Sequence, residues 1–178
     1  MNIKIYPLSG IGTDSIRIAL GMTKDALIAE LGLPETVYEK LPSAPDLTQL
    51  YYYNGELRFD FDVNDTLEFI EFLGGAEGSL QPEIYGVSAF AAIADDLIAL
   101  LTDKGGGEII DDENGYSYAF PAIGIGVYRE SLPEDVEEMR EEHEADGDPL
   151  SEEEYQDELS QAIHWATIGM GARGYYNS

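Results

Sequence analysis

The stretch from Leu50 to Leu73, which reads LYYYNGELRFDFDVNDTLEFIEFL, constrains the fold of this chain more than any other feature of the sequence. Two apolar runs flank Asn54 and Gly55, a pair suited to the positive φ angles that a two-residue type I′ turn requires. The runs are therefore predicted to pair as a hairpin, and the short turn places Tyr52 opposite Leu57. This stretch predicts an antiparallel β-meander.

A second turn near Asn64 and Asp65 starts a third strand, and a two-residue turn there would place Arg58 opposite Glu71. Strand alternation then gives a core face, and its predicted members are Leu50, Tyr52, Leu57, Phe59, Phe61, Val63, Ile70 and Phe72. The outer face is predicted to carry two groups of side chains, the polar Arg58, Asp60 and Asp62 and the largely apolar Tyr51, Tyr53, Leu67 and Phe69. Because a solvated sheet face usually shows less apolar area, we expect another segment to cover it.

The acidity of the chain is its second strong feature. The 178 residues include 36 Asp and Glu against 9 Lys and Arg, a net charge of −27, while 44% are hydrophobic. That apolar share favours a folded acidic protein over a disordered one. Such a charge repels nucleic acid and anionic lipid, and long-range attraction would speed an encounter with a basic partner. The acidity is also compatible with a role in solubility or with a high-salt habitat.

Two absences from the sequence narrow the function classes further. The chain has no cysteine, which excludes a disulfide framework, a thiolate nucleophile and a thiolate metal site. The N-terminal residues MNIKIYPLSG lack a charged region followed by an apolar one, and no run of 18 apolar residues occurs. We therefore expect a cytoplasmic protein that does not bind membranes.

The segment from Glu130 to Glu158 concentrates the negative charge, since it holds 15 of the 36 acidic residues and only one basic residue, Arg140. Pro133 suits a first helical position and predicts a helix that ends near Ala145. Ser151 and Glu154 have the spacing of a capping box and predict a second helix towards Ile163. We expect both helices to lie on the body of the protein as an acidic flank.

A short internal similarity suggests a duplication. The sequence DALIAEL at Asp25–Leu31 resembles DDLIALL at Asp95–Leu101, and each is followed by strands joined through an Asn-Gly pair. The predicted fold class is α+β, a twisted antiparallel β-sheet with helices packed on one side, which a duplicated helix-plus-strands unit would build. We expect a single domain over residues 1–178 that includes the acidic helical segment at about 130–161.

Metal binding and catalysis find little support in the sequence. Six residues, Asp60, Asp62, Asn64, Thr66, Glu68 and Glu71, have the spacing of a calcium loop, but Asp65 stands where that loop requires glycine, and strand alternation produces the same spacing.

The two histidines of the chain do not indicate a catalytic site. His143 lies in a run of glutamates, and His164, next to Trp165, is interpreted as a structural histidine. A glycosidase-type pair of carboxylates stays open, although nothing selects two of the acids. The sequence therefore predicts no enzyme, no cofactor and no metal site.

A set of segments spread over most of the chain is typical of one group of proteins, and these segments are Ile18–Thr23 (IALGMT), Leu31–Pro34 (LGLP), the tyrosine-rich hairpin, Ser117–Arg129 (SYAFPAIGIGVYR) and the aromatic C-terminal end. In these segments the chain resembles the small acidic immunity proteins of bacterial polymorphic-toxin and contact-dependent growth inhibition systems. The residues from Gly21 to Pro34 also resemble units of β-lactamase-inhibitor-like and outer-membrane assembly lipoprotein folds, whose signal peptide, lipidation cysteine and disulfides this chain lacks.

The resemblance to immunity proteins implies an intracellular antitoxin that binds and neutralises a cognate toxin domain, with a basic nuclease as the expected partner. The predicted toxin-binding residues are acidic, Glu134, Glu137, Glu138, Glu141 and Glu142 first and Asp111, Asp112 and Glu113 second. The alternative is an acidic DNA mimic or regulatory protein that occupies a DNA-binding protein. In neither case is nucleic acid itself a partner, and the oligomeric state stays open.

Overall fold

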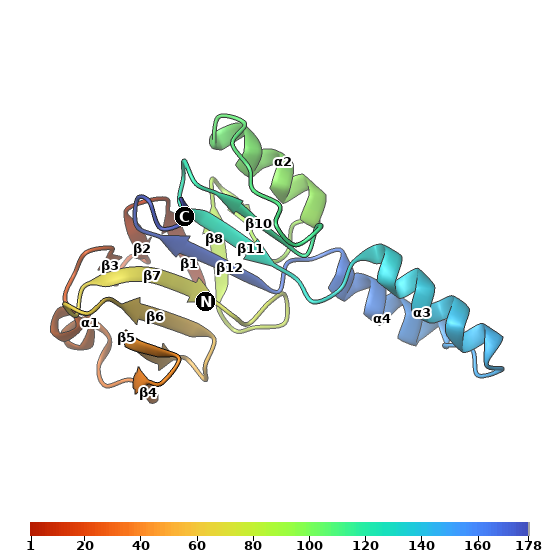
Figure 1. Ribbon diagram of the computed structural model, residues 1–178, viewed down its shortest axis with the longest axis horizontal. Coiled ribbons are helices and arrows are strands. Elements are labelled where there is room, and N and C mark those ends of the chain that lie inside the picture. The colour runs from red at the N-terminus through yellow and green to blue at the C-terminus, as the bar shows by residue number, and fades with distance from the viewer. Residues whose placement is uncertain (178) are drawn as a thin grey trace.

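The computed structural model describes residues 1–177, which form twelve β-strands in two sheets and four helices (Figure 1). The five-stranded sheet has, in spatial order, the strands β3 (Arg17–Ala19), β2 (Gly10–Gly12), β1 (Asn2–Tyr6), β8 (Gln81–Ile84) and β9 (Val87–Ser88). The seven-stranded sheet has the order β10 (Ser117–Phe120), β11 (Ile125–Tyr128), β12 (Thr167–Gly171), β7 (Leu67–Phe72), β6 (Leu57–Phe61), β5 (Ala44–Tyr52) and β4 (Thr36–Leu41).

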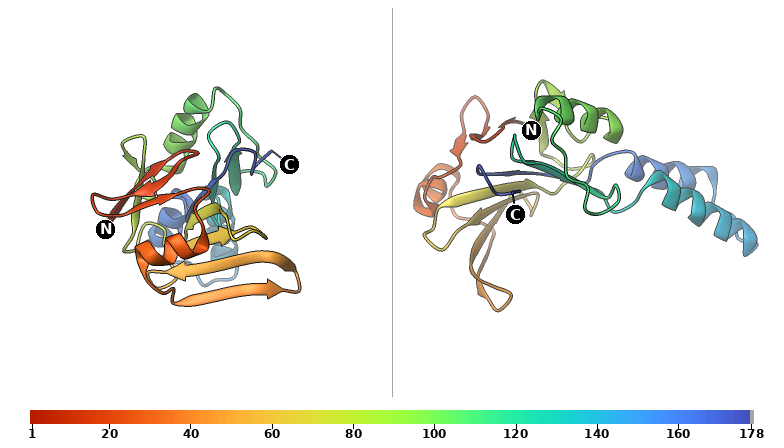
Figure 2. Two further views of the ribbon diagram at one scale, coloured as in Figure 1. Left: turned by 90° about the vertical axis from the view of Figure 1, so that its left-hand side faces the viewer. Right: turned by 45° about the horizontal axis from the view of Figure 1, so that its top comes forward.

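The predicted α+β class is confirmed, although the strands divide between two sheets where one was expected. All strand pairs are antiparallel except β1 with β8, in which Ile5 lies beside Ile84. Buried residues of both sheets join Leu27 of α1 (Lys24–Leu31) and Leu97 of α2 (Ala94–Lys104) in one apolar core. The inner face of the seven-stranded sheet therefore packs against the five-stranded sheet and these two helices (Figure 2).

The register of the meander is as predicted at its first turn. Asn54 and Gly55 have φ angles of 56° and 77°, and Tyr52 lies opposite Leu57. Arg58 lies opposite Glu71. The predicted core members are buried with one exception, since Val63 is 68% exposed in the turn between β6 and β7.

The prediction for Leu67 was also wrong, because the second turn is longer than two residues. The Asp62 carboxylate accepts hydrogen bonds from the backbone N–H groups of Asn64 and Thr66, which closes a wider turn. A β-bulge at Glu68 then places Leu67 opposite Phe61, on the core face. Beyond the bulge the register returns to the predicted one.

The C-terminal residues cover the outer face around Phe69, as the apolar area of this face led us to expect. They do not cover the other two tyrosines predicted there, because Tyr51 contacts Tyr38 of β4 and Tyr53 packs against the core. The ring of Tyr175 stacks on Phe69 with the centroids 4.7 Å apart, and Tyr176 lies across the paired residues Gly126 and Gly169. A Cβ at Gly126 would lie 2.5 Å from the Tyr176 hydroxyl, so the glycine leaves the space that this ring occupies. Phe69 is buried as a result.

The two helices predicted in the acidic segment begin and end close to the predicted residues, and the capping box of Ser151 and Glu154 begins α4 (Glu152–Ala162). The Thr23 hydroxyl caps α1. Helix α2 has no side-chain cap, and the Ala94 N–H at its start donates to the backbone oxygen of Ile163. A tertiary hydrogen bond thus satisfies a backbone donor at the start of this helix.

Helices α3 (Pro133–Ala145) and α4 do not lie on the body as an acidic flank. They pair with each other as a hairpin that projects from the end of the seven-stranded sheet, between β11 and β12 (Figures 1 and 2). Their apolar stripes are narrow and serve mainly to join the two helices. None of the helices in residues 1–177 has both the length and the apolar content needed to cross a bilayer.

The predicted duplication stays a prediction. Helix α1 is followed by β4 and then by β5 and β6, which are joined through Asn54 and Gly55. Helix α2 is followed directly by a bridge from Ile110 to Ala119 that is closed through Asn114 and Gly115. Both Asn-Gly pairs have positive φ angles. The α3–α4 hairpin then lies in the second half alone.

Candidate functional site

The α3–α4 hairpin is held together by contacts between polar and aromatic side chains. The Arg140 guanidinium lies 4.4 Å from the centroid of the Tyr155 ring, and the Tyr155 hydroxyl donates to the Glu137 carboxylate. Arg140 also forms an exposed ion pair with Glu144 at 3.6 Å. The only basic residue of the segment is therefore engaged within the hairpin, which leaves the other carboxylates without a cationic neighbour on the same segment.

A buried arginine fixes the base of the hairpin. Arg129, at the end of β11, is only 6% exposed, and its guanidinium donates to the backbone oxygens of Gly115 at 3.1 Å and Ala162 at 2.9 Å. It also lies 4.7 Å from the centroid of the Trp165 ring, a cation–π contact. These contacts tie the end of β11, the end of α4 and the turn before β10 to one point.

The end of α4 is also bound to the start of α2. The Trp165 indole N–H donates to the backbone oxygen of Ala94 at 3.1 Å, and Nδ1 of His164 lies 3.0 Å from the backbone oxygen of Ala92. This is the type of contact predicted for a structural histidine. Together with the bond from Ala94 to Ile163, these contacts position the hairpin relative to the core.

The first group of predicted binding residues lies along α3, where Glu134, Glu137, Glu138, Glu141 and Glu142 are all exposed. Residues four apart on a helix share one face, about 6 Å apart along the axis, so Glu134, Glu138 and Glu142 form a row. The segment from Glu130 to Glu158 has a formal charge of −14, about half of the −27 of the chain. This charge is presented on a projection that is open to solvent on most sides (Figure 1).

The second predicted group, Asp111, Asp112 and Glu113, lies in the exposed turn before β10 and next to the start of α3. The Tyr116 hydroxyl, just after this turn, donates to the carboxylate of Asp135 on α3. Two hydrogen bonds, first from Tyr116 and then from the Leu132 N–H, lower the pKa of Asp135. The structure thus brings the second group close to the start of α3, beside Glu134, whereas Glu138, Glu141 and Glu142 lie further along the helix. Asp111 has a local role there, because it accepts from the Gly115 N–H at 2.8 Å.

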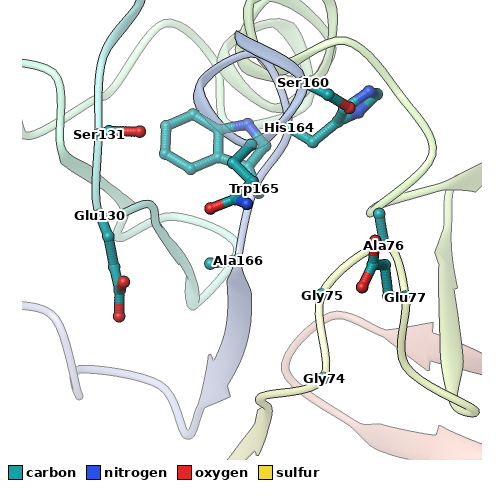
Figure 3. Close-up of a pocket in the computed structure, with 11 residues that line it drawn as sticks. Gly74, Gly75, Ala76, Glu77, Glu130, Ser131, Ser160, His164, Trp165 and Ala166 are labelled. Carbon is teal, nitrogen blue, oxygen red and sulfur yellow. The ribbon is translucent and has the colours of Figure 1, made fainter. Parts of the chain in front are cut away.

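A pocket of about 230 Å³ opens at the base of the hairpin, on the side of the loop from Gly74 to Glu77 (Figure 3). Glu130 and Ser131 lie on one wall, Glu77 lies on the opposite wall, and Trp165 lies at the back. Both carboxylates are exposed, so the pocket continues the negative surface of the hairpin onto the body. Its geometry suits a positively charged side chain of a partner.

A second concavity, of about 400 Å³, lies on the outer face of the seven-stranded sheet, and we call it the sheet groove. Arg58 and Glu71 lie at its base, Asp112 and Glu113 line one side, and Tyr175 lines another. The sequence predicts that Arg58 and Glu71 lie opposite each other but does not indicate the groove. The outline of the groove depends on the Tyr175 and Tyr176 rings, which the fold brings onto the outer face of the sheet.

The Arg58 side chain is neutralised inside the groove. Its guanidinium binds Asp60 through two hydrogen bonds, of 2.9 and 3.2 Å, and lies 3.3 Å from Glu71. Burial raises the pKa of both carboxyls, and the attraction of Arg58 opposes that rise. The residues Asp60, Asp62 and Glu71 of the calcium-like spacing are therefore engaged separately, in an ion-pair cluster and in a turn. Residues 1–177 hold no cluster of three or more His, Asp or Glu arranged as metal ligands.

Comparison of the chain with protein-family models, with curated proteins and with solved structures finds no significant match.

Proposed function

We propose that this chain is an intracellular immunity protein that binds a cationic toxin domain, with a basic nuclease as the partner class, and blocks its active site. The observation that carries this proposal is the acidic α3–α4 hairpin, which projects from the body and exposes the carboxylates of Glu134, Glu138, Glu141 and Glu142. The proposal includes a cytoplasmic location, because a nuclease would have to be neutralised where its substrate is. The chain has no catalytic activity of its own in this role.

Charge and packing contribute differently to such a complex. The −27 charge would raise the rate of encounter with a basic protein, and this attraction decreases with salt. The rigid base around Arg129 and Trp165 holds the hairpin in one orientation, so little conformational entropy is lost when a partner binds. A row of carboxylates about 6 Å apart would occupy the positions at which a nuclease holds the phosphates of its substrate.

The test compares two variants that remove the same number of charges. The hairpin variant carries Glu134→Gln, Glu138→Gln, Glu141→Gln and Glu142→Gln, and the matched control carries Asp14→Asn, Glu39→Gln, Asp46→Asn and Glu108→Gln, all at exposed positions outside the hairpin. Each is coexpressed with the toxin-like proteins encoded beside this chain, and survival, complex formation by size exclusion and Kd by calorimetry are measured. We expect the control to protect cells and the hairpin variant to weaken binding at least tenfold. Equal binding by both variants, or no binding by the unmodified chain, contradicts the proposal.

The regular row of carboxylates on α3 favours a second candidate function, an acidic DNA mimic or regulator of DNA-binding proteins. Such a protein would bind several unrelated basic proteins, and its affinity would fall steeply with salt. An immunity protein should instead keep one partner at moderate salt. Binding to a panel of basic DNA-binding proteins at about 50 and 200 mM salt separates the two candidates.

A further inference from the structure

The sheet groove combines negative charge with exposed aromatic rings beside the hairpin. Asp112 and Glu113 line it from the turn before β10, and Tyr128 and Tyr175, which are 39% and 40% exposed, contribute aromatic rings. The Tyr176 ring, which occupies the space over Gly126 and Gly169, also lines the groove. A cavity of about 400 Å³ is large enough for one long side chain.

The charge available to a ligand comes from the rim of the groove. Arg58 is already paired with Asp60 and Glu71, whereas Asp112 and Glu113 are exposed and form no ion pair within residues 1–177. Burial, and then the carboxylates of Asp60 and Glu68, raise the pKa of Tyr175 to about 12, which agrees with a negative potential in the groove. An anion would therefore be repelled here.

The groove is also continuous with the acidic hairpin. Tyr128 and Thr167, which both line it, are paired at the end of β11 and the start of β12, where the chain leaves the sheet for α3 and returns from α4. Asp112 and Glu113 precede Tyr116, which binds Asp135 of α3. A protein that contacts the hairpin could reach the groove without a gap between the two surfaces.

We propose that the sheet groove receives an arginine side chain of the cationic partner, stacked on Tyr128 or Tyr175 and paired with Asp112 and Glu113. A planar guanidinium fits such a site better than an ammonium group, because it stacks on tyrosine rings and binds carboxylates through two parallel hydrogen bonds. This inference rests on the proposed function for the nature of the partner. It adds the groove to the hairpin as a separate contact surface.

The probe for the test is the capped peptide acetyl-Gly-Arg-Gly-amide, with the same peptide carrying citrulline or lysine as controls. Amide chemical shifts of the labelled full chain are followed during titration. We expect the arginine peptide to shift the amides of Gly126, Tyr128 and Thr167, which line the groove. The lysine peptide should bind several-fold more weakly, and the citrulline peptide should cause no shifts in the groove.

Variants separate this inference from the proposed function. Asp112→Asn with Glu113→Gln should weaken binding of the arginine peptide at least fivefold, and Tyr128→Ala should weaken it further, whereas Tyr38→Ala at the β4 edge should not. The hairpin variant should bind the peptide in the groove as the unmodified chain does.

Three outcomes would overturn the inference, namely chemical shift changes confined to α3 and α4, equal binding of the citrulline peptide, and no effect of the Asp112 and Glu113 substitutions. If the arginine peptide enters the groove but no encoded partner binds, the proposed function fails and the groove remains a guanidinium site.

Discussion

Arg129 is a buried cation that has backbone oxygens as its partners. Its planar side chain reaches Gly115 and Ala162 at the same time and stacks on Trp165, so geometry matters here as much as charge. A lysine at this position would keep the positive charge. Its compact ammonium group would lose at least one of the hydrogen bonds to Gly115 and Ala162, and it would not stack on Trp165.

Arg129→Lys is therefore expected to reduce the free energy of unfolding by about 2 kcal/mol, the scale of a lost hydrogen bond to a charged group. The measurement is urea denaturation followed by the fluorescence of Trp165, the only tryptophan in the chain. Arg173→Lys, at an exposed position, is the control and should leave the midpoint unchanged. A midpoint for Arg129→Lys equal to that of the unmodified chain would show that this side chain does not fix the base of the hairpin.

Asp135 makes the stability of the hairpin base dependent on pH. Its pKa is lowered in the folded state, first by the Tyr116 hydroxyl and then by the Leu132 N–H. The carboxylate therefore stabilises the fold above its unfolded pKa of about 3.9, and this contribution is lost as the pH falls through the lower folded value. We expect Asp135→Asn to cost about 1 kcal/mol at pH 7, comparable to the loss of a helix cap, and much less near pH 3.

Urea denaturation at pH 7, 5 and 3 measures the difference between Asp135→Asn and the unmodified chain. Asp157→Asn, on the exposed surface of α4, serves as the control. A difference that stays constant over this pH range would mean that the charge of Asp135 contributes nothing to the fold.

At the scale of elements, the hairpin differs from the rest of the fold because its helices pack mainly on each other. Its interface relies on Tyr155, Arg140 and a narrow apolar stripe, and its carboxylates repel one another. Local opening should therefore cost less there than in the sheet, where β6, β7 and β12 form the centre of the core.

We expect the amides of α3 and α4 beyond Val136 to exchange with deuterium faster than those of β6, β7 and β12. Salt should slow this exchange, because it screens the repulsion between carboxylates. Hydrogen exchange followed by mass spectrometry at about 20 and 500 mM NaCl provides the measurement. Equal protection of the hairpin and the central strands would indicate that the hairpin is as stable as the core.

Local signals predicted local structure well in this chain. The Asn54–Gly55 turn fixed the pairing of Tyr52 with Leu57, and Pro133 and Ser151 marked where two helices begin. The parallel pairing of Ile5 with Ile84 could not be predicted, because it joins segments far apart in the sequence through a shared core. The Glu68 bulge was missed for a related reason, since the turn that produces it is closed by the Asp62 side chain.

The sequence predicts which residues belong to the candidate site but not how these residues are arranged in space. The acidic residues of α3 and of the 111–113 turn were identified from charge alone, but the direction of the hairpin depends on contacts that Arg129 and Trp165 make with distant backbone oxygens. The sheet groove depends on where the C-terminal rings of Tyr175 and Tyr176 lie on the outer face, beside Phe69 of β7. Neither arrangement follows from the order of residues along one segment.

At the scale of the whole molecule, the net charge of −27 destabilises the folded state. Like charges on a compact body repel, and salt shortens the range of this repulsion from about 30 Å at 0.01 M to about 3 Å at 1 M. We therefore expect the Tm to rise as NaCl is added, by about 2–4 °C for each 1 kcal/mol of repulsion that is screened.

The hairpin variant should have a higher Tm at low salt than the control with four charges removed elsewhere, because charge density is highest on α3 and α4. Its Tm should also rise less than that of the control when salt is added. Thermal unfolding followed by circular dichroism at several NaCl concentrations, repeated in KCl, measures both effects. A Tm that does not respond to salt would mean that the exposed carboxylates are too well solvated to destabilise the fold, and the acidity would then be available for partner binding at no cost in stability.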